Sequence, residues 1–355
     1  MKPFEYLRPE TLPEALEAVR PGAAYLAGGT NLLDLMKTGA AAPDLLIDIS
    51  RLPGLEAIET LPDGALRLGA GLRNADLARA PEILADFPLL AEATLSGASA
   101  QIRNAATLAG NLLQRPRCPW LFLPEADRAR RAPAAGCAAR AGGADRQMAV
   151  LGWSERCIAT HPSDLCVALA ALDPVVEIAG PDGMREIPFD ALHRLPGEAP
   201  SVETSLAPGE LILALRLPPE ARAFARHARY VKLRERTSFA FALVSAAAAL
   251  RLEDGRIVEA RLALGGVAAK PWRAVEAEAA LAGQAPTPAA FTQAAEAALA
   301  QAAPSGDNSD KIEFARRTLV RALSLAAEAD GEGAPPTWPG SVFSPLSQEA
   351  ADVRA

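Results

Sequence analysis

One stretch of twelve residues, Thr107-Leu-Ala-Gly-Asn-Leu-Leu-Gln-Arg-Pro-Arg-Cys118, combines a small-residue turn, an apolar turn, two arginines and a cysteine. A second stretch of related chemistry, Tyr25-Leu-Ala-Gly-Gly-Thr-Asn-Leu32, lies between an apolar strand and a helix. Glycine lets the backbone approach a phosphate closely, and a helix start points unpaired N–H groups toward it. Two such loops suit a diphosphate that bridges two subdomains, each loop contacting one phosphate.

Each loop also has a simpler interpretation as a tight turn without a ligand, because short glycine motifs occur often by chance. Gly28–Asn31 is not a Walker loop, since no Lys-Ser/Thr pair follows it, and it lacks the glycine spacing of a dinucleotide fingerprint. The two loops together favour binding over chance.

Composition limits the remaining functions. The 355 residues are enough for two or three domains with cores of their own. A net charge of −7 argues against nucleic acid as the main partner, and 5% aromatic residues argue against a stacking platform for single strands.

The N-terminus lacks the apolar core of a signal peptide. The longest apolar runs, Leu165–Leu172 and Phe239–Leu250, are too short to span a bilayer. We therefore expect no membrane span, a chain that is cytoplasmic as synthesised, and a periplasmic location only after export with a signal-bearing partner.

The residue pattern predicts an α+β protein of three consecutive domains and a tail. A first subdomain, 1–55, has a β-α-β-α-β pattern, and a second, 56–218, combines strands of a mixed sheet with helices. The second carries an irregular, cysteine-containing insertion at 118–157. A C-terminal domain, 219–329, has three strands followed by helices, and the tail, 330–355, is rich in Pro, Gly and Ser.

Two helices are predicted before the twelve-residue stretch, Asn74–Ala80 with Asn74 as its cap, and Pro81–Thr94. Asp164, at the start of a buried helix, is a candidate acceptor for ribose or ribityl hydroxyls, or simply a carboxylate at a helix N-terminus. Lys232, on a strand, is a candidate flavin or phosphate contact, or a solvated residue of an edge strand.

Four cysteines, Cys118, Cys137, Cys157 and Cys166, fall in one region of the chain. Four thiolates are the ligand set of an iron–sulfur cluster, whereas zinc is disfavoured without a close Cys-x-x-Cys pair. Scattered thiols are the alternative, and Cys166 on an apolar helix face is typical of a buried core thiol. His161 is a further candidate metal ligand, although a structural role for this histidine is favoured.

Several stretches in order resemble the FAD-binding subunits of the molybdenum hydroxylases, the family of xanthine dehydrogenase, carbon monoxide dehydrogenase and aldehyde oxidoreductase. The resemblance covers residues 1 to about 328 and is carried by Tyr25–Leu32, Ile102-Arg-Asn-Ala-Ala-Thr-Leu-Ala-Gly-Asn-Leu112, Ile158-Ala-Thr-His-Pro-Ser-Asp-Leu165, Glu210-Leu-Ile-Leu-Ala-Leu-Arg-Leu-Pro218 and Tyr230-Val-Lys-Leu-Arg-Glu-Arg236. Within the family, the residues around Cys118 and Cys157 are most similar to the flavin subunits of bacterial periplasmic aldehyde oxidoreductases.

This resemblance implies an FAD site and its residues. The expected cofactor contacts are Tyr25, Leu26, Ala27, Gly28, Gly29, Thr30, Asn31, Leu32, Gly97, Thr107, Leu108, Ala109, Gly110, Asn111, Asp164, Ile212 and Lys232. In the aldehyde oxidoreductase subgroup the insertion binds a [4Fe–4S] cluster through four cysteines. Cys118, Cys137 and Cys157 match three of them, no cysteine stands near Arg128 where the second is expected, and Cys166 substitutes only if its helix faces the insertion.

The resemblance also implies partners: a large subunit that carries molybdopterin and oxidises an aldehyde, and a small subunit with [2Fe–2S] clusters. This chain would take electrons from those clusters onto FAD and pass them to an external acceptor. No catalytic residue is expected here, since the redox chemistry belongs to the cofactor. Two alternatives are a stand-alone flavin oxidase and a scaffold subunit without cofactor.

Overall fold

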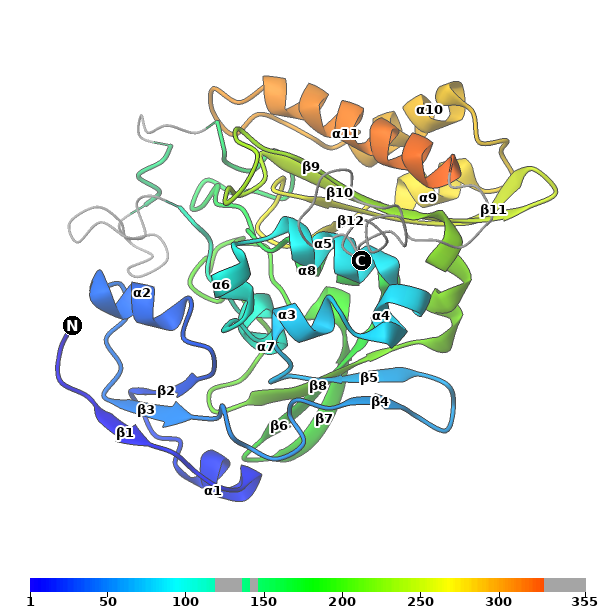
Figure 1. The fold of residues 1–355 in the computed structure, drawn as a ribbon. Helices are drawn as coiled ribbons and strands as arrows, with labels where there is room; N and C mark the ends of the chain where they lie inside the picture. The colour runs from blue at the N-terminus through cyan, green and yellow to red at the C-terminus, as the bar shows by residue number, and fades with distance from the viewer. Residues whose placement is uncertain (119–135, 141–145, 329–355) are drawn as a thin grey trace, which may run out of the picture.

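The computed structural model describes residues 1–118, 136–140 and 146–328 of the 355-residue chain (Figure 1). The predicted tail and most of the predicted insertion lie outside the described residues. Helices and strands are mixed along the chain, and the strands form three separate sheets. The predicted α+β class is therefore confirmed. No helix in the described ranges has both the length and the apolar character needed to cross a membrane.

The N-terminal section has the predicted β-α-β-α-β order. Its elements are β1 (Glu5–Leu7), α1 (Leu12–Glu17), β2 (Ala23–Leu26), α2 (Leu32–Lys37) and β3 (Leu45–Asp48). The strands form a parallel sheet with β3 in the centre, and all four residues of β3 are buried. Because β2 ends at Leu26, the first glycine loop lies at the carboxyl end of a parallel strand, where ligands of α/β units commonly bind.

The second section contains a five-stranded sheet in the order β4-β5-β8-β6-β7. Its strands are β4 (Ile58–Thr60), β5 (Leu66–Gly69), β6 (Val175–Gly180), β7 (Gly183–Pro188) and β8 (Leu211–Leu217). Every pair is antiparallel, which corrects the predicted mixed sheet. The reason is the topology: β4–β5 and β6–β7 are hairpins, and β8 enters between them antiparallel to both neighbours.

The chain forms several short helices between β5 and β6, and these helices cover one face of the second sheet (Figure 1). They are α3 (Asn74–Leu77), α4 (Pro81–Asp86), α5 (Pro88–Ser96), α6 (Ala100–Arg103), α7 (Leu108–Leu112) and α8 (Asp164–Leu172). The predicted single helix over 81–94 is two helices, because Pro88 disfavours a helical Phe87, which adopts φ −138° and ψ 50°. Asn74 is the first residue of α3 rather than its cap; Arg73 holds the cap position without a side-chain hydrogen bond.

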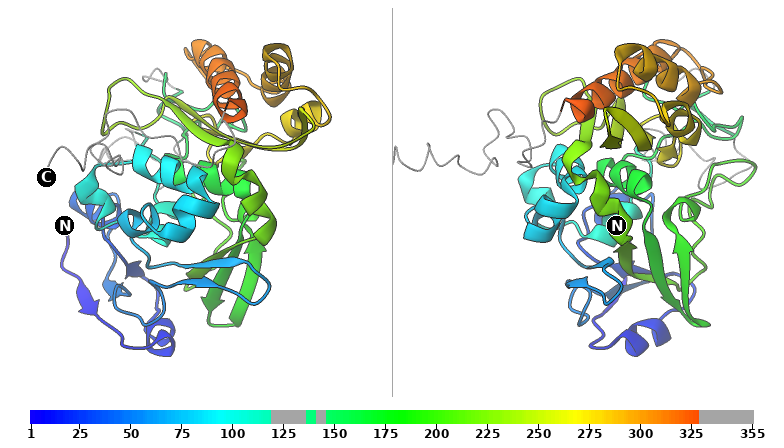
Figure 2. Two further views of the ribbon diagram at one scale, coloured as in Figure 1. Left: turned by 45° about the vertical axis from the view of Figure 1, so that its right-hand side comes forward. Right: turned by 90° about the vertical axis from the view of Figure 1, so that its right-hand side faces the viewer.

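The C-terminal section places three helices over one face of a four-stranded sheet (Figures 1 and 2). A 3-10 helix, η4 (Pro219–His227), leads into β9 (Ala228–Leu233), β10 (Val244–Glu253), β11 (Arg256–Gly265), β12 (Trp272–Arg273), α9 (Val275–Leu281), α10 (Pro288–Ala298) and α11 (Asp310–Ala327). The three predicted strands are present, and the short β12 adds a fourth. Successive side chains of a strand face opposite sides, so Ala246 and Ala248 contact the helix layer while Ala247 and Ala249 face the second section.

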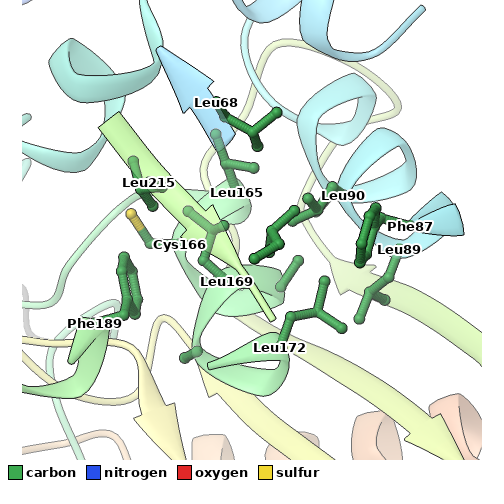
Figure 3. Packing of buried hydrophobic residues seen from close by; sticks show 14 of the residues in the cluster. Leu68, Phe87, Leu89, Leu90, Leu165, Cys166, Leu169, Leu172, Phe189 and Leu215 are labelled. Carbon is green, nitrogen blue, oxygen red and sulfur yellow. The ribbon is translucent and has the colours of Figure 1, made fainter. Parts of the chain in front are cut away.

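Helix α8 lies at the centre of the molecule. All nine of its residues are buried, and it packs against α5, β10 and β11. Figure 3 shows its Leu165, Leu169 and Leu172 among side chains of α5 and of the second sheet. Ser163 caps its N-terminus by accepting a hydrogen bond from the Cys166 N–H at 3.1 Å. A helix held on all sides fixes the positions of the polar residues at its start.

Helix α5 and strand β9 are joined by a buried carboxylate. Glu92 Oε2 accepts a hydrogen bond from the backbone N–H of Tyr230 at 2.7 Å. Burial raises the pKa of Glu92 from 4.5 to about 7, against the lowering effects of that N–H and of Arg229. A pKa that is higher in the folded than in the unfolded chain favours folding at low pH, and this contribution is lost as the pH rises from about 4.5 through about 7.

We predict that Glu92→Gln removes this pH dependence, because glutamine keeps the acceptor for Tyr230 and cannot ionise. The stability of the variant relative to wild type, as the free energy of unfolding, rises by about 2.5 kcal/mol between pH 5 and pH 8. Urea unfolding at both pH values measures it, with Glu82→Gln on the exposed face of α4 as control. Equal gains in stability for Glu92→Gln and Glu82→Gln would contradict the assignment of this pH dependence to Glu92.

Candidate cofactor-binding site

A cavity of about 510 Å³ lies where the three sections of the chain meet. The first section contributes Thr30 and Asn31, the second Gly97, Gly110, Asn111 and Asp164, and the third the connection from β9 to β10. A volume in this range is typical of sites for small molecules and cofactors. The structure therefore brings residues of both glycine loops and Asp164 to one place.

The two glycine loops touch each other. A Cβ atom on Gly28 would lie 1.9 Å from the Ala105 carbonyl oxygen, so only glycine fits at this contact. Gly29 adopts φ +71°, the left-handed conformation that glycine tolerates. Asn31 Oδ1 then accepts a hydrogen bond from the backbone N–H of Arg115 at 3.0 Å. Gly28 is thus required for the close approach to Ala105, and Gly29 for the turn that follows it, whatever the loops bind.

The predicted contact residues fall into three groups. Six line the large cavity: Thr30, Asn31, Gly97, Gly110, Asn111 and Asp164. Four line a second cavity of about 260 Å³: Ala27, Gly28, Thr107 and Ala109. Seven line neither of the two: Tyr25, Leu26, Gly29, Leu32, Leu108, Ile212 and Lys232. Within the last group, Ile212 is fully buried in the core beneath α8, whereas Lys232 lies directly behind a cavity residue.

Asp164 and Lys232 form a buried ion pair. The Lys232 Nζ lies 2.8 Å from Asp164 Oδ2, and the two side chains are 4% and 6% exposed. Tyr230 donates its hydroxyl to Asp164 Oδ1 at 2.7 Å, and Lys232 also donates to the Ser96 carbonyl at 3.0 Å. Burial, followed by the neighbouring Asp164, raises the pKa of Tyr230 well above 10.0. Lys232 is therefore not a solvated edge-strand residue.

Two buried polar atoms at the cavity wall have no partner among the described residues. They are Asn31 Nδ2 and Asn74 Oδ1, one donor and one acceptor. Buried amide groups are nearly always hydrogen-bonded, so a polar ligand in this cavity would satisfy both. Asn74 is only 4% exposed. Its place in the cavity wall could not be predicted from the sequence, because an asparagine before an apolar turn is typical of a helix cap.

Aromatic and cationic side chains line the cavity from the β9–β10 connection. Phe239 and Phe241 are about half exposed, with the guanidinium groups of Arg236 and Arg117 at 5.6 Å and 5.5 Å from their ring centres. Phe239 adopts φ +50°, which is rare for a bulky residue, and its carbonyl accepts hydrogen bonds from Arg236. The sequence gives no periodic signal for these residues, because they belong to a loop.

The three carboxylates that line the cavity are all ion-paired. Asp164 pairs with Lys232, Asp34 lies 3.7 Å from Arg117, and Glu235 lies 3.1 Å from Arg146. Each carboxylate of the cavity wall therefore has a cationic neighbour within the described residues.

The four cysteines have different surroundings. Cys118 lines a small cavity with His161, Cys137 packs against a minor cluster around Met148, and Cys157 is buried. Cys166 lies in the main core, where Figure 3 shows it between Phe189 and Leu215, and burial raises the pKa of its thiol to about 12. This position inside the main core does not support Cys166 as the fourth cluster ligand.

Cys166, His161 and His193 are nonetheless the one group in the described parts of the chain with three metal-ligand atoms within 4.8 Å of one another. Both Nε2 atoms face the Leu112 carbonyl oxygen, at 2.9 Å for His193 and 3.4 Å for His161. The Nδ1 atom of His161 accepts the Ser163 N–H at 3.4 Å. These hydrogen bonds occupy both ring nitrogens of His161 and the Nε2 atom of His193.

Comparison with known proteins identifies the family. Residues 2–220 match the family described as "FAD binding domain in molybdopterin dehydrogenase", and residues 229–327 match "CO dehydrogenase flavoprotein C-terminal domain". The chain is an FAD-binding subunit of the molybdenum hydroxylase family. It is 47% identical over 330 residues to the aldehyde oxidoreductase FAD-binding subunit PaoB of Escherichia coli, covering 92% of this chain and 99% of the relative.

Other relatives of this FAD-binding subunit are named as carbon monoxide dehydrogenase chains. It is 29% identical to the carbon monoxide dehydrogenase medium chain of Hydrogenophaga pseudoflava, covering 91% of this chain and 96% of that one. A solved structure of carbon monoxide dehydrogenase from that organism superposes with a TM-score of 0.70, covering 92% of this chain and 98% of the other at 30% identity. A structure of the CO dehydrogenase from Oligotropha carboxidovorans superposes with a TM-score of 0.72 at 26% identity. This superposition covers 92% of this chain and 99% of the other.

We predict that Lys232→Met lowers the free energy of unfolding by about 3–5 kcal/mol, because it leaves Asp164 buried without its cation. The double variant Lys232→Met with Asp164→Asn recovers part of this loss, since asparagine still accepts the Tyr230 hydroxyl and carries no charge. Urea unfolding without added flavin measures both. A single variant that costs less than about 1 kcal/mol would mean that the pair is solvated.

We predict that replacing Asn74, whose side-chain oxygen is buried without a partner among the described residues, stabilises the cofactor-free protein and weakens FAD binding. Asn74→Leu has nearly the same shape and removes an unsatisfied buried acceptor, so the protein without cofactor gains about 1 kcal/mol in stability. The same variant loses one hydrogen bond to the cofactor and binds FAD about tenfold more weakly. Thermal unfolding and a fluorescence titration with FAD check the two effects, and unchanged FAD affinity would place Asn74 outside the site.

Proposed function

We propose that this chain holds FAD in the 510 Å³ cavity and acts as the electron-transfer subunit of a molybdenum-dependent aldehyde oxidoreductase. The observation that carries the site is the pair of unpartnered amide atoms, Asn31 Nδ2 and Asn74 Oδ1, in a wall shared by both glycine loops. The aldehyde assignment rests on the 47% identity to a relative named as an aldehyde oxidoreductase subunit.

The loops at 28–31 and 107–111, which contribute residues both to this cavity and to the second cavity of about 260 Å³, would hold the two phosphates. Asp164, backed by Lys232, would accept hydrogen bonds from the cofactor's hydroxyls, and Gly97 leaves room beside it. The other predicted contacts, including Ile212, stay predictions. We also propose the division into domains 1–55, 56–218 and 219–329, whose three sheets are separate.

Electron transfer is favoured over direct substrate oxidation by the similarity to relatives named as an FAD-binding subunit and a medium chain. FAD, when bound, supplies both one- and two-electron chemistry, so it can connect a cluster to an acceptor. The chain's residues bind and orient the cofactor, and Asp34, Asp164 and Glu235 are all committed to cationic partners. The names of the relatives, an FAD-binding subunit and a medium chain, argue against a stand-alone flavin oxidase.

The proposed partners are a large subunit with molybdopterin, where the aldehyde is oxidised, and a small subunit with [2Fe–2S] clusters. Relatives named "medium chain" support an assembly with other chains. Synthesis in the cytoplasm, with periplasmic location only after export on a signal-bearing partner, completes the proposal. A [4Fe–4S] cluster on Cys118, Cys137 and Cys157 stays a prediction.

The test compares the purified full chain with the complex obtained by co-expressing its genomic neighbours. The full chain is expected to show flavin absorption near about 450 nm and no bleaching with an aldehyde. The complex is expected to bleach under anaerobic conditions on adding the aldehyde. Bleaching of the isolated chain would favour the stand-alone oxidase, and a colourless chain that takes up no added FAD would favour the scaffold.

An iron assay on the same isolated chain addresses the cluster. Roughly four irons per chain would establish a complete [4Fe–4S] cluster, and iron near zero would leave Cys118, Cys137 and Cys157 as thiols without a metal.

A further inference from the structure

We propose that His161 and His193 are positioning residues of the flavin site: both imidazoles, neutral and protonated at Nε2, donate to the Leu112 carbonyl and thereby hold Asn111 and Ser163 in the cavity wall. The proposal rests on the proposed FAD site. It assigns a role to a buried histidine pair that does not itself line the large cavity.

The protonation of the two rings follows from what they contact. A carbonyl oxygen can only accept, and it has two lone pairs, so both Nε2 atoms that face Leu112 must carry a proton. In a neutral ring the other nitrogen is then an acceptor, which matches the Ser163 N–H directed at His161 Nδ1. The rings meet edge to face with centres 4.5 Å apart.

The shared carbonyl belongs to the wall of the cavity. Leu112 is the last residue of α7, where helix carbonyls lack partners within the helix. Its neighbour Asn111 accepts the Ser163 hydroxyl at 2.6 Å through Oδ1, and both residues line the cavity. The segments around Asn111 and Ser163 are therefore joined both at the wall and directly behind it, which fixes the spacing between the second glycine loop and Asp164.

The surroundings of His193 keep its ring uncharged. His161 and His193 are each 6% exposed, and a second charge beside the first would meet no compensating solvent. The ionisable groups that face His193 are Lys270, Glu203 and Asp190, together with Cys166 and His161. Burial, the largest effect, lowers the pKa of His193 to about 4, so the hydrogen-bonded neutral form persists at physiological pH.

The experiment uses the full chain and exploits its three histidines. His193→Leu removes the donor and is expected to weaken FAD binding at least about tenfold. His193→Gln keeps a side-chain N–H that can reach the Leu112 carbonyl, so its FAD affinity is expected to stay within about threefold of wild type. The third histidine, His227, bonds the Ala326 carbonyl far along the chain, so His227→Gln is the matched control with unchanged affinity.

Two further readouts separate positioning from general stability. The visible circular dichroism of bound flavin should change in His193→Leu and return in His193→Gln. Histidine-selective ¹⁵N NMR of the wild type should give two neutral Nε2–H tautomers at pH 6, a result that needs no variant to fold.

A loss of thermal stability in His193→Leu with unchanged FAD affinity and dichroism would overturn the proposal. An Nδ1–H tautomer or a charged ring for either buried histidine would overturn it as well. If the wild-type chain binds no FAD, the proposed function itself fails, which the titration of the unaltered protein reveals before any variant is compared.

Discussion

The site depends on the buried ion pair between Asp164 and Lys232. With 2.8 Å between charged atoms and almost no exposure, neither residue tolerates loss of the other. The pair joins the start of α8 to β9, and Lys232 also holds the Ser96 carbonyl at the end of α5. Gly97 follows immediately, and a Cβ there would lie 3.2 Å from Asp164 Oδ2. One charge pair therefore fixes the meeting of three elements and the shape of the cavity wall.

Around this pair, the protein satisfies most polar groups internally and leaves a few for a ligand. Asn111 accepts a hydrogen bond from the Ser163 hydroxyl. The rings of His161 and His193 both hydrogen-bond the Leu112 carbonyl. In contrast, Asn31 Nδ2 and Asn74 Oδ1 are buried without a partner among the described residues. A wall that is rigid elsewhere and unsatisfied at these atoms is pre-organised for a polar cofactor, which suits a subunit whose chemistry comes from that cofactor.

Much of the fold could be predicted because its signals are local. Caps and periodicity predict the β-α-β-α-β unit, and apolar runs predict α8. The antiparallel arrangement of the second sheet could not be predicted, since β5 pairs with β8 across a long separation in sequence. Pro88 was a local signal for a helix break that the apolar pattern of 81–94 concealed. In the site, the glycine loops carry a motif, whereas Asn74 resembles a helix cap and Phe239 belongs to a loop without a periodic pattern.

Hydrogen–deuterium exchange of the full chain with and without FAD tests the central claim most directly. The account predicts that FAD slows exchange together at backbone amides of 28–31, 107–111 and 162–165, because one ligand contacts three segments that are distant in sequence. Protection in only one of these segments, or mainly in the outer helices of the C-terminal section, would contradict a cofactor site at the junction.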